Sequence, residues 1–295
     1  MDIQLSPHVT VISGAKGGKY PDGNSTMIRG SEGVVLIDPS LTVHDRGGVG
    51  VTVDRVLISH AHEDHMAGVG AVGATHVCTH EADLIGVQSL DGFMQVYGLP
   101  AEAEAEWRAT VEREFNVTGW PTATGFADGD VFDLGDTSVS VMHLPGHTRG
   151  HSAFVVESDA VAFIGDVDLS TFGPYYGDHW SDLAEFEESL VRIRDLDAAY
   201  YVTFHHKGVV KGRDEFLRLL DLFESVIARR DDALMEMLNQ PRPFADLLER
   251  GIVYRAGSRP PVFGESVERR SIMMHLDRLI AADVVVEHEG LFLLK

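Results

Sequence analysis

The sequence predicts a mixed α/β sandwich, in one large domain with a smaller C-terminal part. Three observations support this fold class. Short β-rich runs follow one another across Gly-, Asp- and Asn-containing turns, helical segments alternate with the later strands, and 44% of the 295 residues are hydrophobic, which is ample for a core. No apolar run approaches the roughly 20 residues that a membrane span needs.

Strands are expected where aliphatic or β-branched runs are bounded by turn residues. Residues 53–59 (VDRVLIS) are almost continuously apolar, which is typical of a buried strand. The other expected strands cover 8–14, 25–30, 33–40, 128–146, 152–158, 160–166 and 198–206. Several of these runs are consecutive hairpins, so the pattern favours a sandwich over a regular βαβ series.

Helices are expected over 79–86, 101–115, 181–196 and 266–282, with a long helix after residue 213. Apolar residues recur at helical spacing along the long helix, from Phe216 to Ile227. Residues 283–295 resemble a β-hairpin that turns at Glu289–Gly290. We therefore expect a domain over 1–215 and an extension over 216–295 that contains the long helix and a winged-helix-like module.

The net charge of −22 limits the choice of partners. The chain has 24 Lys and Arg residues against 46 Asp and Glu residues, so an extended nucleic acid is an unlikely ligand and a small molecule is the expected one. The only cysteine, Cys78, excludes an intrachain disulfide framework and fits a reducing compartment. The N-terminus lacks the basic and apolar regions of a signal peptide. We expect a cytoplasmic protein that does not enter a membrane.

The segment HAHEDH, residues 60–65, follows the buried strand directly. Zinc prefers imidazole and carboxylate ligands. A loop leaving the strand can turn His60 and His62 toward one ion, while Asp64 and His65 face a second. A solvated His-rich loop is the alternative, because the chain contains 15 histidines.

Three further strand ends carry the same residue types. His147 and His151 lie in the glycine-rich turn GHTRGH, Asp166 ends the strand FIGD, and His205 and His206 end the strand YVTFHH. A rigid sheet fixes loop residues at its strand ends, so four such ends favour a metal site over a solvated loop.

With these motifs in place, the chain resembles the metallo-β-lactamase superfamily of αββα four-layer hydrolases, in its glyoxalase II or lactamase-β-like branch. The HxHxDH signature matches residues 60–65, and the resemblance covers roughly residues 5–215. It implies a catalytic domain over 1–215. It also implies a binuclear centre with two zinc ions, although iron or manganese stay open alternatives.

The resemblance also implies the role of each ligand. His60, His62 and His147 would hold one ion, and Asp166 would bridge both. Asp64, His65 and a final histidine would hold the second ion. His206 is favoured for that last position because HKGVV fits the family's register better, and His205 is the alternative. Asp64 and His151 are assigned to the catalytic set, His151 as a residue that orients a ligand.

The expected reaction is hydrolysis by a metal-bound hydroxide. A small thioester, ester or lactone is the first choice of substrate, and a nuclease or phosphodiesterase acting on RNA or a nucleotide is the alternative. His62 stands where oxygen-reducing di-iron members carry glutamate, which favours zinc hydrolysis. Asp166 favours the glyoxalase II, lactonase and nuclease branches over zinc β-lactamases. A mono-iron persulfide dioxygenase and a metal-bound sensor without turnover are further alternatives.

Two regions outside the motifs have expected roles. The polar, aromatic loop over 169–180 is predicted to line a substrate pocket through Tyr175, Tyr176 and His179. The extension resembles the winged helix found behind some lactamase-like domains, but the acidic chain favours packing or homodimerisation over nucleic-acid binding, with the extension covering the active site. His76, His80 and His143 are expected to be structural or exposed.

Overall fold

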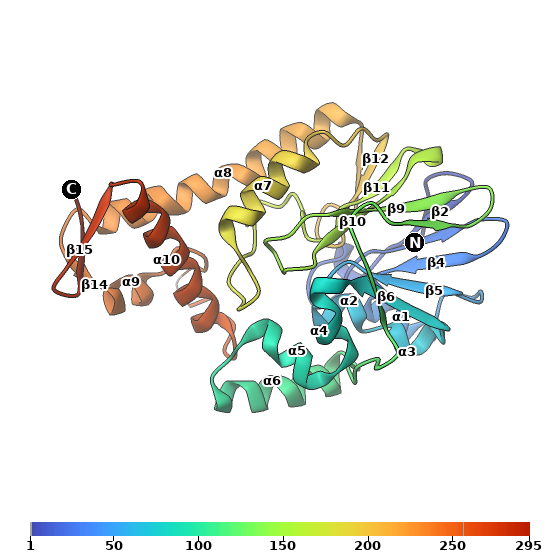
Figure 1. Cartoon of the computed structure of the whole chain (residues 1–295), viewed down its shortest axis with the longest axis horizontal. Helices are drawn as coiled ribbons and strands as arrows, with labels where there is room; N and C mark the ends of the chain where they lie inside the picture. The colour runs from blue at the N-terminus through green and yellow to red at the C-terminus, as the bar shows by residue number, and fades with distance from the viewer. Residues whose placement is uncertain (1, 256) are drawn as a thin grey trace.

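The computed structural model describes residues 2–255 and 257–295, which form two sheets stacked face to face with helices outside them (Figure 1). The first sheet has seven strands in chain order, β1 to β7. Strands β1 to β4 pair antiparallel, and β4 to β7 pair parallel. The strands are β1 (Ile3–Gln4), β2 (Val9–Ile12), β3 (Ser25–Arg29), β4 (Val34–Ile37), β5 (Arg55–Ile58), β6 (His76–His80) and β7 (Thr124–Phe126).

The second sheet has six strands in the order β13-β12-β11-β10-β9-β8. All neighbours pair antiparallel except β11 and β12, which are parallel. The strands are β8 (Val131–Asp133), β9 (Ser138–His143), β10 (Ser152–Val156), β11 (Val161–Phe163), β12 (Tyr200–Val202) and β13 (Val209–Lys211). The hairpins that the sequence predicts over 128–166 are thus present.

The core between the sheets is built from alternate residues of both, for example Val35 and Leu57 from the first sheet and Phe154 and Phe163 from the second. A second apolar cluster packs helices on the outer face of the first sheet, and a third packs helices on the outer face of the second sheet. The layers therefore follow the order αββα, and the predicted fold class is confirmed.

Most helices of the first outer layer are short. This layer contains α1 (Leu41–Asp45), α2 (Glu63–Met66), α3 (Val69–Val72), α4 (Leu84–Gln88), α5 (Leu90–Tyr97) and α6 (Ala101–Glu114), of which α6 is the longest. The second outer layer contains α7 (Leu183–Ile193) and the start of α8 (Arg213–Met237). The helix predicted over 79–86 is only partly present, because Thr79 and His80 belong to strand β6, which pairs parallel with β5 and β7, and α4 begins at Leu84. Tertiary pairing outweighs helical propensity there.

The C-terminal extension has a core of its own, and α8 links it to the sandwich (Figure 1). The first half of α8 packs on the second sheet through residues such as Phe216 and Phe223, and Leu234 belongs to the extension. The predicted boundary at residue 215 therefore falls at the start of a continuous helix. The extension contains α9 (Phe244–Arg250), α10 (Gly264–Ala281) and a three-stranded sheet of β14 (Arg242–Pro243), β16 (Leu291–Leu294) and β15 (Val285–His288).

The predicted hairpin at the C-terminus is present, and both residues of its turn, Glu289 and Gly290, have positive φ. The helix–hairpin order agrees with the expected elements, while the winged-helix assignment stays a prediction. None of the helices in the described part of the chain is long and apolar enough to cross a membrane.

Candidate metal centre

The centre lies where β5 ends in the middle of the first sheet. His60 follows β5 after a single residue, and His62 directly precedes α2, whose first turn contains Glu63 and Asp64. The short helix turns Asp64 and His65 away from the first two histidines. Because the chain changes from strand to helix here, residues of one short segment reach two neighbouring clusters. This agrees with the expectation from the HAHEDH spacing.

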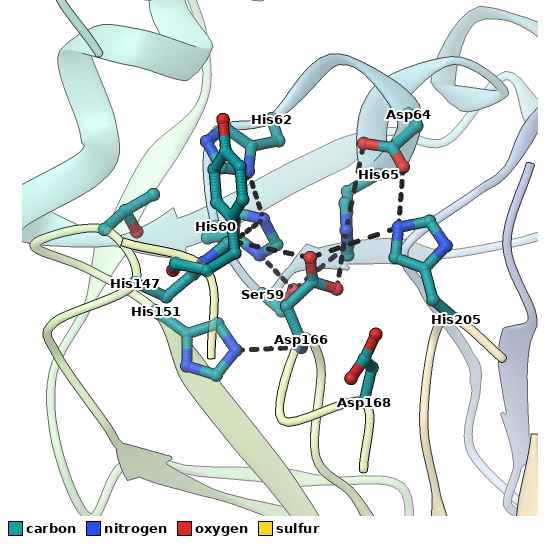
Figure 2. Close-up of polar contacts among 12 residues, drawn as sticks. Ser59, His60, His62, Asp64, His65, His147, His151, Asp166, Asp168 and His205 are labelled. Atoms are coloured by element: carbon teal, nitrogen blue, oxygen red, sulfur yellow. Dashed lines mark hydrogen bonds and ion pairs between the residues drawn. The ribbon is translucent and has the colours of Figure 1, made fainter. Parts of the chain in front are cut away.

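Three imidazoles form the first cluster (Figure 2). The Nε2 atom of His60 lies 2.9 Å from Nδ1 of His62, and Nε2 of His147 lies 3.1 Å from each of those nitrogens. Oδ2 of Asp166 is 3.4 Å from Nε2 of His147. All three histidines are buried, and three of their ring nitrogens converge on one point.

Asp64, His65 and His205 form the second cluster. The Nε2 atom of His205 lies 2.9 Å from Oδ2 of Asp64, and Nε2 of His65 lies 3.9 Å from Oδ1 of Asp64. Asp166 faces this cluster too, with its Oδ1 atom 3.1 Å from Nε2 of His65. The carboxylate of Asp166 therefore has one oxygen toward each cluster, as a bridging ligand requires.

The donor set fits metal ions better than it fits hydrogen bonds. Nε2 of His65, Oδ1 of Asp166 and Oδ2 of Asp64 are buried, and among the described residues their close ion-pair contacts do not have the geometry of a hydrogen bond. Ligand atoms about 2.0–2.1 Å from a tetrahedral zinc lie about 3.3 Å apart, close to the spacing in the first cluster. Buried polar atoms are normally hydrogen-bonded, so converging atoms without such bonds indicate a site for a cation.

The second nitrogen of each ring has a partner that fixes the ring's orientation, as is common for metal-binding histidines. These partners are the Ser59 hydroxyl for His60, Asp178 for His62, Asp38 for His65, the Tyr175 carbonyl for His147 and the Gly18 carbonyl for His205, at 2.7–3.0 Å. Donation of the outer N–H to these acceptors leaves the inner nitrogen with a lone pair directed into the cluster.

Three buried acids near the ligands, Asp38, Asp83 and Asp178, were not predicted from the sequence. Asp38 is the first of them along the chain. Its carboxylate accepts hydrogen bonds from the Ser59 N–H at 2.7 Å and from Nδ1 of His65, also at 2.7 Å. Burial raises the pKa of Asp38, and the adjacent His65 opposes that increase. Asp38 directly follows β4, and its role depends on the pairing of β4 with β5, which brings it to Ser59 and His65.

Asp83 connects the two ligand loops. Its Oδ2 atom accepts hydrogen bonds from the Ala61 N–H at 2.9 Å and the Thr148 hydroxyl at 2.7 Å, and its Oδ1 atom accepts from the Gly150 N–H at 2.7 Å. This side chain is fully buried. It therefore fixes the HAHEDH loop and the GHTRGH loop relative to each other. The sequence pattern placed Asp83 on a helix and indicated no role for it.

His151 lies beside the clusters and gives no atom to either of them. Its Nδ1 atom donates to the Leu144 carbonyl at 3.0 Å, and its Nε2 atom accepts from the Asp166 N–H at 3.1 Å. Burial lowers the pKa of His151 to about 3, so the ring is neutral and can accept at Nε2. The structure therefore places His151 where it orients Asp166.

The structure corrects the preference for His206 as the final ligand. His206, whose φ is 58°, gives no atom to either cluster, and its Nε2 atom lies 3.4 Å from Oδ2 of Asp168. The ring of His205 is buried and lies against Asp64 instead. The sequence register could not show this, because the left-handed backbone at His206 depends on the loop's tertiary contacts.

A cavity of about 260 Å³ opens beside both clusters. It is bounded by ligand side chains and by the rings of Tyr20, Tyr97, Tyr175 and Tyr254. Glu63 also borders it and accepts hydrogen bonds from the hydroxyls of Tyr20 and Tyr97. Burial, followed by the charge of Asp64, raises the pKa of Glu63 to about 7.

The extension supplies one wall of this cavity through Tyr254, Pro260 and Phe263. The three residues lie in the connection between α9 and α10. The expectation that the C-terminal part covers the site agrees with this placement. Its expected role in homodimerisation stays a prediction.

Only one of the three predicted pocket residues lies at the cavity. Tyr175 lines it, whereas Tyr176 is buried elsewhere, with its hydroxyl 2.8 Å from Nε2 of His275. His179 is exposed and borders a separate surface depression beside Arg149. The side chains of neighbouring loop residues point in different directions, so their nearness in the sequence predicted too many pocket residues.

A sequence profile described as "Metallo-beta-lactamase superfamily" matches residues 20–206. The chain belongs to the metallo-β-lactamase superfamily. Among curated relatives, it is 30% identical over 172 residues to the Bos taurus protein named acyl-coenzyme A thioesterase MBLAC2, a match that covers 50% of this chain and 60% of that relative. It is 24% identical over 224 residues to a Francisella philomiragia protein named hydroxyacylglutathione hydrolase, covering 76% and 74%.

Solved structures show the same fold over nearly the whole chain. A metallo-β-lactamase family protein from Thermus thermophilus has a TM-score of 0.71 at 21% identity, covering 99% of this chain and 100% of that one. A β-lactamase domain protein from Burkholderia ambifaria has a TM-score of 0.68 at 18% identity, covering 100% and 93%. The shared fold therefore includes the C-terminal extension.

Proposed function

We propose that this protein is a metal-dependent thioester hydrolase. The observation that carries the proposal is the pair of clusters that share Asp166 beside a tyrosine-walled cavity. The thioester class is supported by relatives named acyl-coenzyme A thioesterase and hydroxyacylglutathione hydrolase.

Two zinc ions are the proposed cofactors. The first cluster and the second would each hold one ion, with Asp166 between them and His205 as the final ligand. A bound pair of such ions supplies a hydroxide near neutral pH and polarises the carbonyl group that it attacks. The donor set of imidazoles and carboxylates suits zinc and also iron or manganese, so metal analysis belongs to the test.

The chain's own residues bind and orient the substrate. The tyrosine rings offer apolar faces for the acyl group, and the hydroxyls of Tyr20 and Tyr97, which donate to Glu63, hold these rings at the cavity wall. Pro260 and Phe263 exclude water on the side of the extension. Asp38, Asp178 and the Tyr175 carbonyl hold three of the imidazoles in place.

A nuclease or phosphodiesterase is the weaker candidate. Among the described residues that line the cavity, none is lysine or arginine, while Glu63, Asp168 and Asp178 contribute acidic groups. A polyanionic backbone would be repelled by such a wall.

The test is a hydrolysis panel with metal-loaded protein of known metal content. Thioesters are expected to be hydrolysed faster than lactones, β-lactams and phosphodiesters, with about two zinc ions per chain. One iron per chain with oxidation of a persulfide would replace the proposal by sulfur chemistry. Unchanged metal content and turnover in His60→Ala and Asp64→Ala would reject the site itself.

A further inference from the structure

A second depression, of about 410 Å³, lies at the junction of the sandwich and the extension. Three segments meet there: Thr171 and Phe172 from the loop after β11, residues of α8, and residues 252–255 with Ser258 from the connection between α9 and α10. It shares Phe172 and Tyr254 with the metal-centre cavity, so the two spaces are neighbours across one pair of rings. The centroids of these rings are 6.0 Å apart.

The charge of this depression differs from that of the whole chain. Arg229, Arg230 and Arg255 line it, and no acidic side chain is among its described lining residues. Acidic residues outnumber basic ones by 46 to 24 in the sequence. A local excess of three positive charges beside an acidic centre therefore indicates a place for an anion.

The three arginines differ in burial and in hydrogen bonding. Arg230 is buried and donates to the Pro174 and Phe172 carbonyls at 2.6 and 3.1 Å, so it holds the loop. Arg229 and Arg255 are exposed, and their guanidinium groups have no hydrogen-bond or ion-pair partner within the described ranges 2–255 and 257–295. Free guanidinium groups bind phosphate or carboxylate through paired N–H donors. The hydroxyl of Thr171 adds a donor at the same depression, whereas that of Ser258 donates to the Arg255 carbonyl at 2.8 Å.

We propose that Arg229 and Arg255 bind an anionic group on the thiol half of the thioester substrate. This inference rests on the proposed function. It extends that function by naming the substrate class: thioesters of a charged thiol, whose acyl end lies in the tyrosine-walled cavity while the charged end reaches the arginines. Phosphate on coenzyme A and carboxylate on glutathione share the required chemistry, and the experiment separates them.

The kinetic test compares three thioesters that carry one acyl group on coenzyme A, glutathione or N-acetylcysteamine. The last thiol is uncharged. Arg229→Ala and Arg255→Ala are each expected to lower the kcat/KM ratio of the charged thioester to the neutral one by about tenfold. The loss should appear mainly in KM and shrink at high salt. A loss confined to the coenzyme A ester assigns phosphate, and a loss confined to the glutathione ester assigns carboxylate.

Arg218→Ala is the matched control. Arg218 is on α8, eleven residues before Arg229, and is exposed in an ion pair with Glu215 at 2.6 Å. Its removal changes the net charge equally and should leave the ratio unchanged. An equal ratio in the wild type and both test variants overturns the inference, and so does an equal fall in Arg218→Ala.

A binding measurement separates this inference from the proposed reaction. Calorimetric titration of the whole protein with adenosine 3′,5′-bisphosphate, adenosine and S-methylglutathione does not require turnover. Binding of one anionic probe that weakens about tenfold in Arg229→Ala, with no binding of adenosine, supports the subsite even if no thioester is hydrolysed. In that case only the proposed function fails. Absence of binding by both anionic probes overturns the subsite, whatever the hydrolysis panel shows.

Discussion

Two groups of histidine rings lie close together in this protein and differ in where their nitrogens point. His80 and His143 stack face to face, with centroids 3.8 Å apart and planes 9° apart. His60 and His147 are also close, at 4.5 Å, but their planes make an angle of 80° and their Nε2 atoms meet.

The outer contacts of the two groups differ as well. In the stacked pair, Nδ1 of His80 accepts from the Ala82 N–H and Nε2 of His143 contacts the Arg149 carbonyl, so these nitrogens are used in local backbone contacts. In the clusters, one nitrogen of each ring is held by an outer acceptor while the other converges with its neighbours. A metal site is thus distinguished from other closely packed histidines by convergence and orientation rather than by the number of histidines.

Removal of a converging ring is expected to have the largest effect. His147→Ala deletes one corner of the first cluster, so metal content should fall by about one ion per chain and hydrolysis should fall by more than about 100-fold, beyond the loss of an outer partner. Elemental analysis and a thioester assay measure both. His143→Ala is the control, and it should keep its metal; if both variants bind metal equally, the comparison fails.

Removal of an outer partner should have an intermediate effect. Asp178→Asn replaces the carboxylate that lies 3.0 Å from Nε2 of His62, and the amide is a poorer acceptor for that N–H. Zinc affinity is expected to fall roughly 10–100-fold. Competition with a zinc-binding dye measures the change.

Asp182→Asn is the control for that experiment. Asp182 lies in the same region and caps α7 by accepting from the Glu185 N–H, a role that asparagine can also fill. Its zinc affinity should match that of the wild type. An equal loss in both variants would mean that the loop, and not the orientation of His62, was disturbed.

Opening the wall formed by the extension should affect binding of the substrate more than that of the metal. Phe263→Ala removes an apolar ring that borders the cavity, so KM for a thioester should rise about three- to tenfold with unchanged zinc content. Steady-state kinetics test this. Ile280→Ala, an exposed change on α10, should leave KM unaltered, and loss of zinc in Phe263→Ala would contradict the assignment.

The stacked pair should give the smallest effect, and only in acid. Burial, followed by the neighbouring His143, lowers the pKa of His80 to about 4, below its ordinary value of 6.5. The stability from the neutral ring is fully present above pH 6.5 and is lost as the pH falls toward 4. His80→Gln should therefore reduce the fall in Tm between pH 7.5 and 5 by about 2–4 °C. Thermal unfolding of both proteins across this range checks the sign, and a steeper fall in the variant would refute it.

The sequence predicted most of the fold because its strands are strongly apolar and bounded by turns. It also selected His60, His62, Asp64 and His65, which are contiguous and follow a buried strand. For the last ligand the sequence favoured His206, whereas the cluster contains its neighbour His205. The positive φ at His206 belongs to the loop and could not be predicted from the sequence. Pocket residues such as Tyr176 were misplaced because side-chain direction in a loop is set by packing rather than by sequence distance.

The outer acids were out of reach for a different reason. Asp38, Asp83 and Asp178 are isolated in sequence, and each acquires its role only when distant segments meet. Nothing in a single acidic residue distinguishes a buried orienting group from the many acids on the surface of a chain with 46 of them. The sequence therefore predicted the candidate metal ligands and missed the acids that orient them or their loops.

The bonds to Asp83 have a consequence for how ions enter. Since its carboxylate joins the HAHEDH and GHTRGH loops through protein contacts alone, the entropy of ordering those loops is lost when the chain folds and not when a cation arrives. The protein then acts as a rigid chelator that is complete before loading. A sample stripped of metal is expected to stay folded and to accept a replacement ion, such as a spectroscopically active one, in solution without refolding.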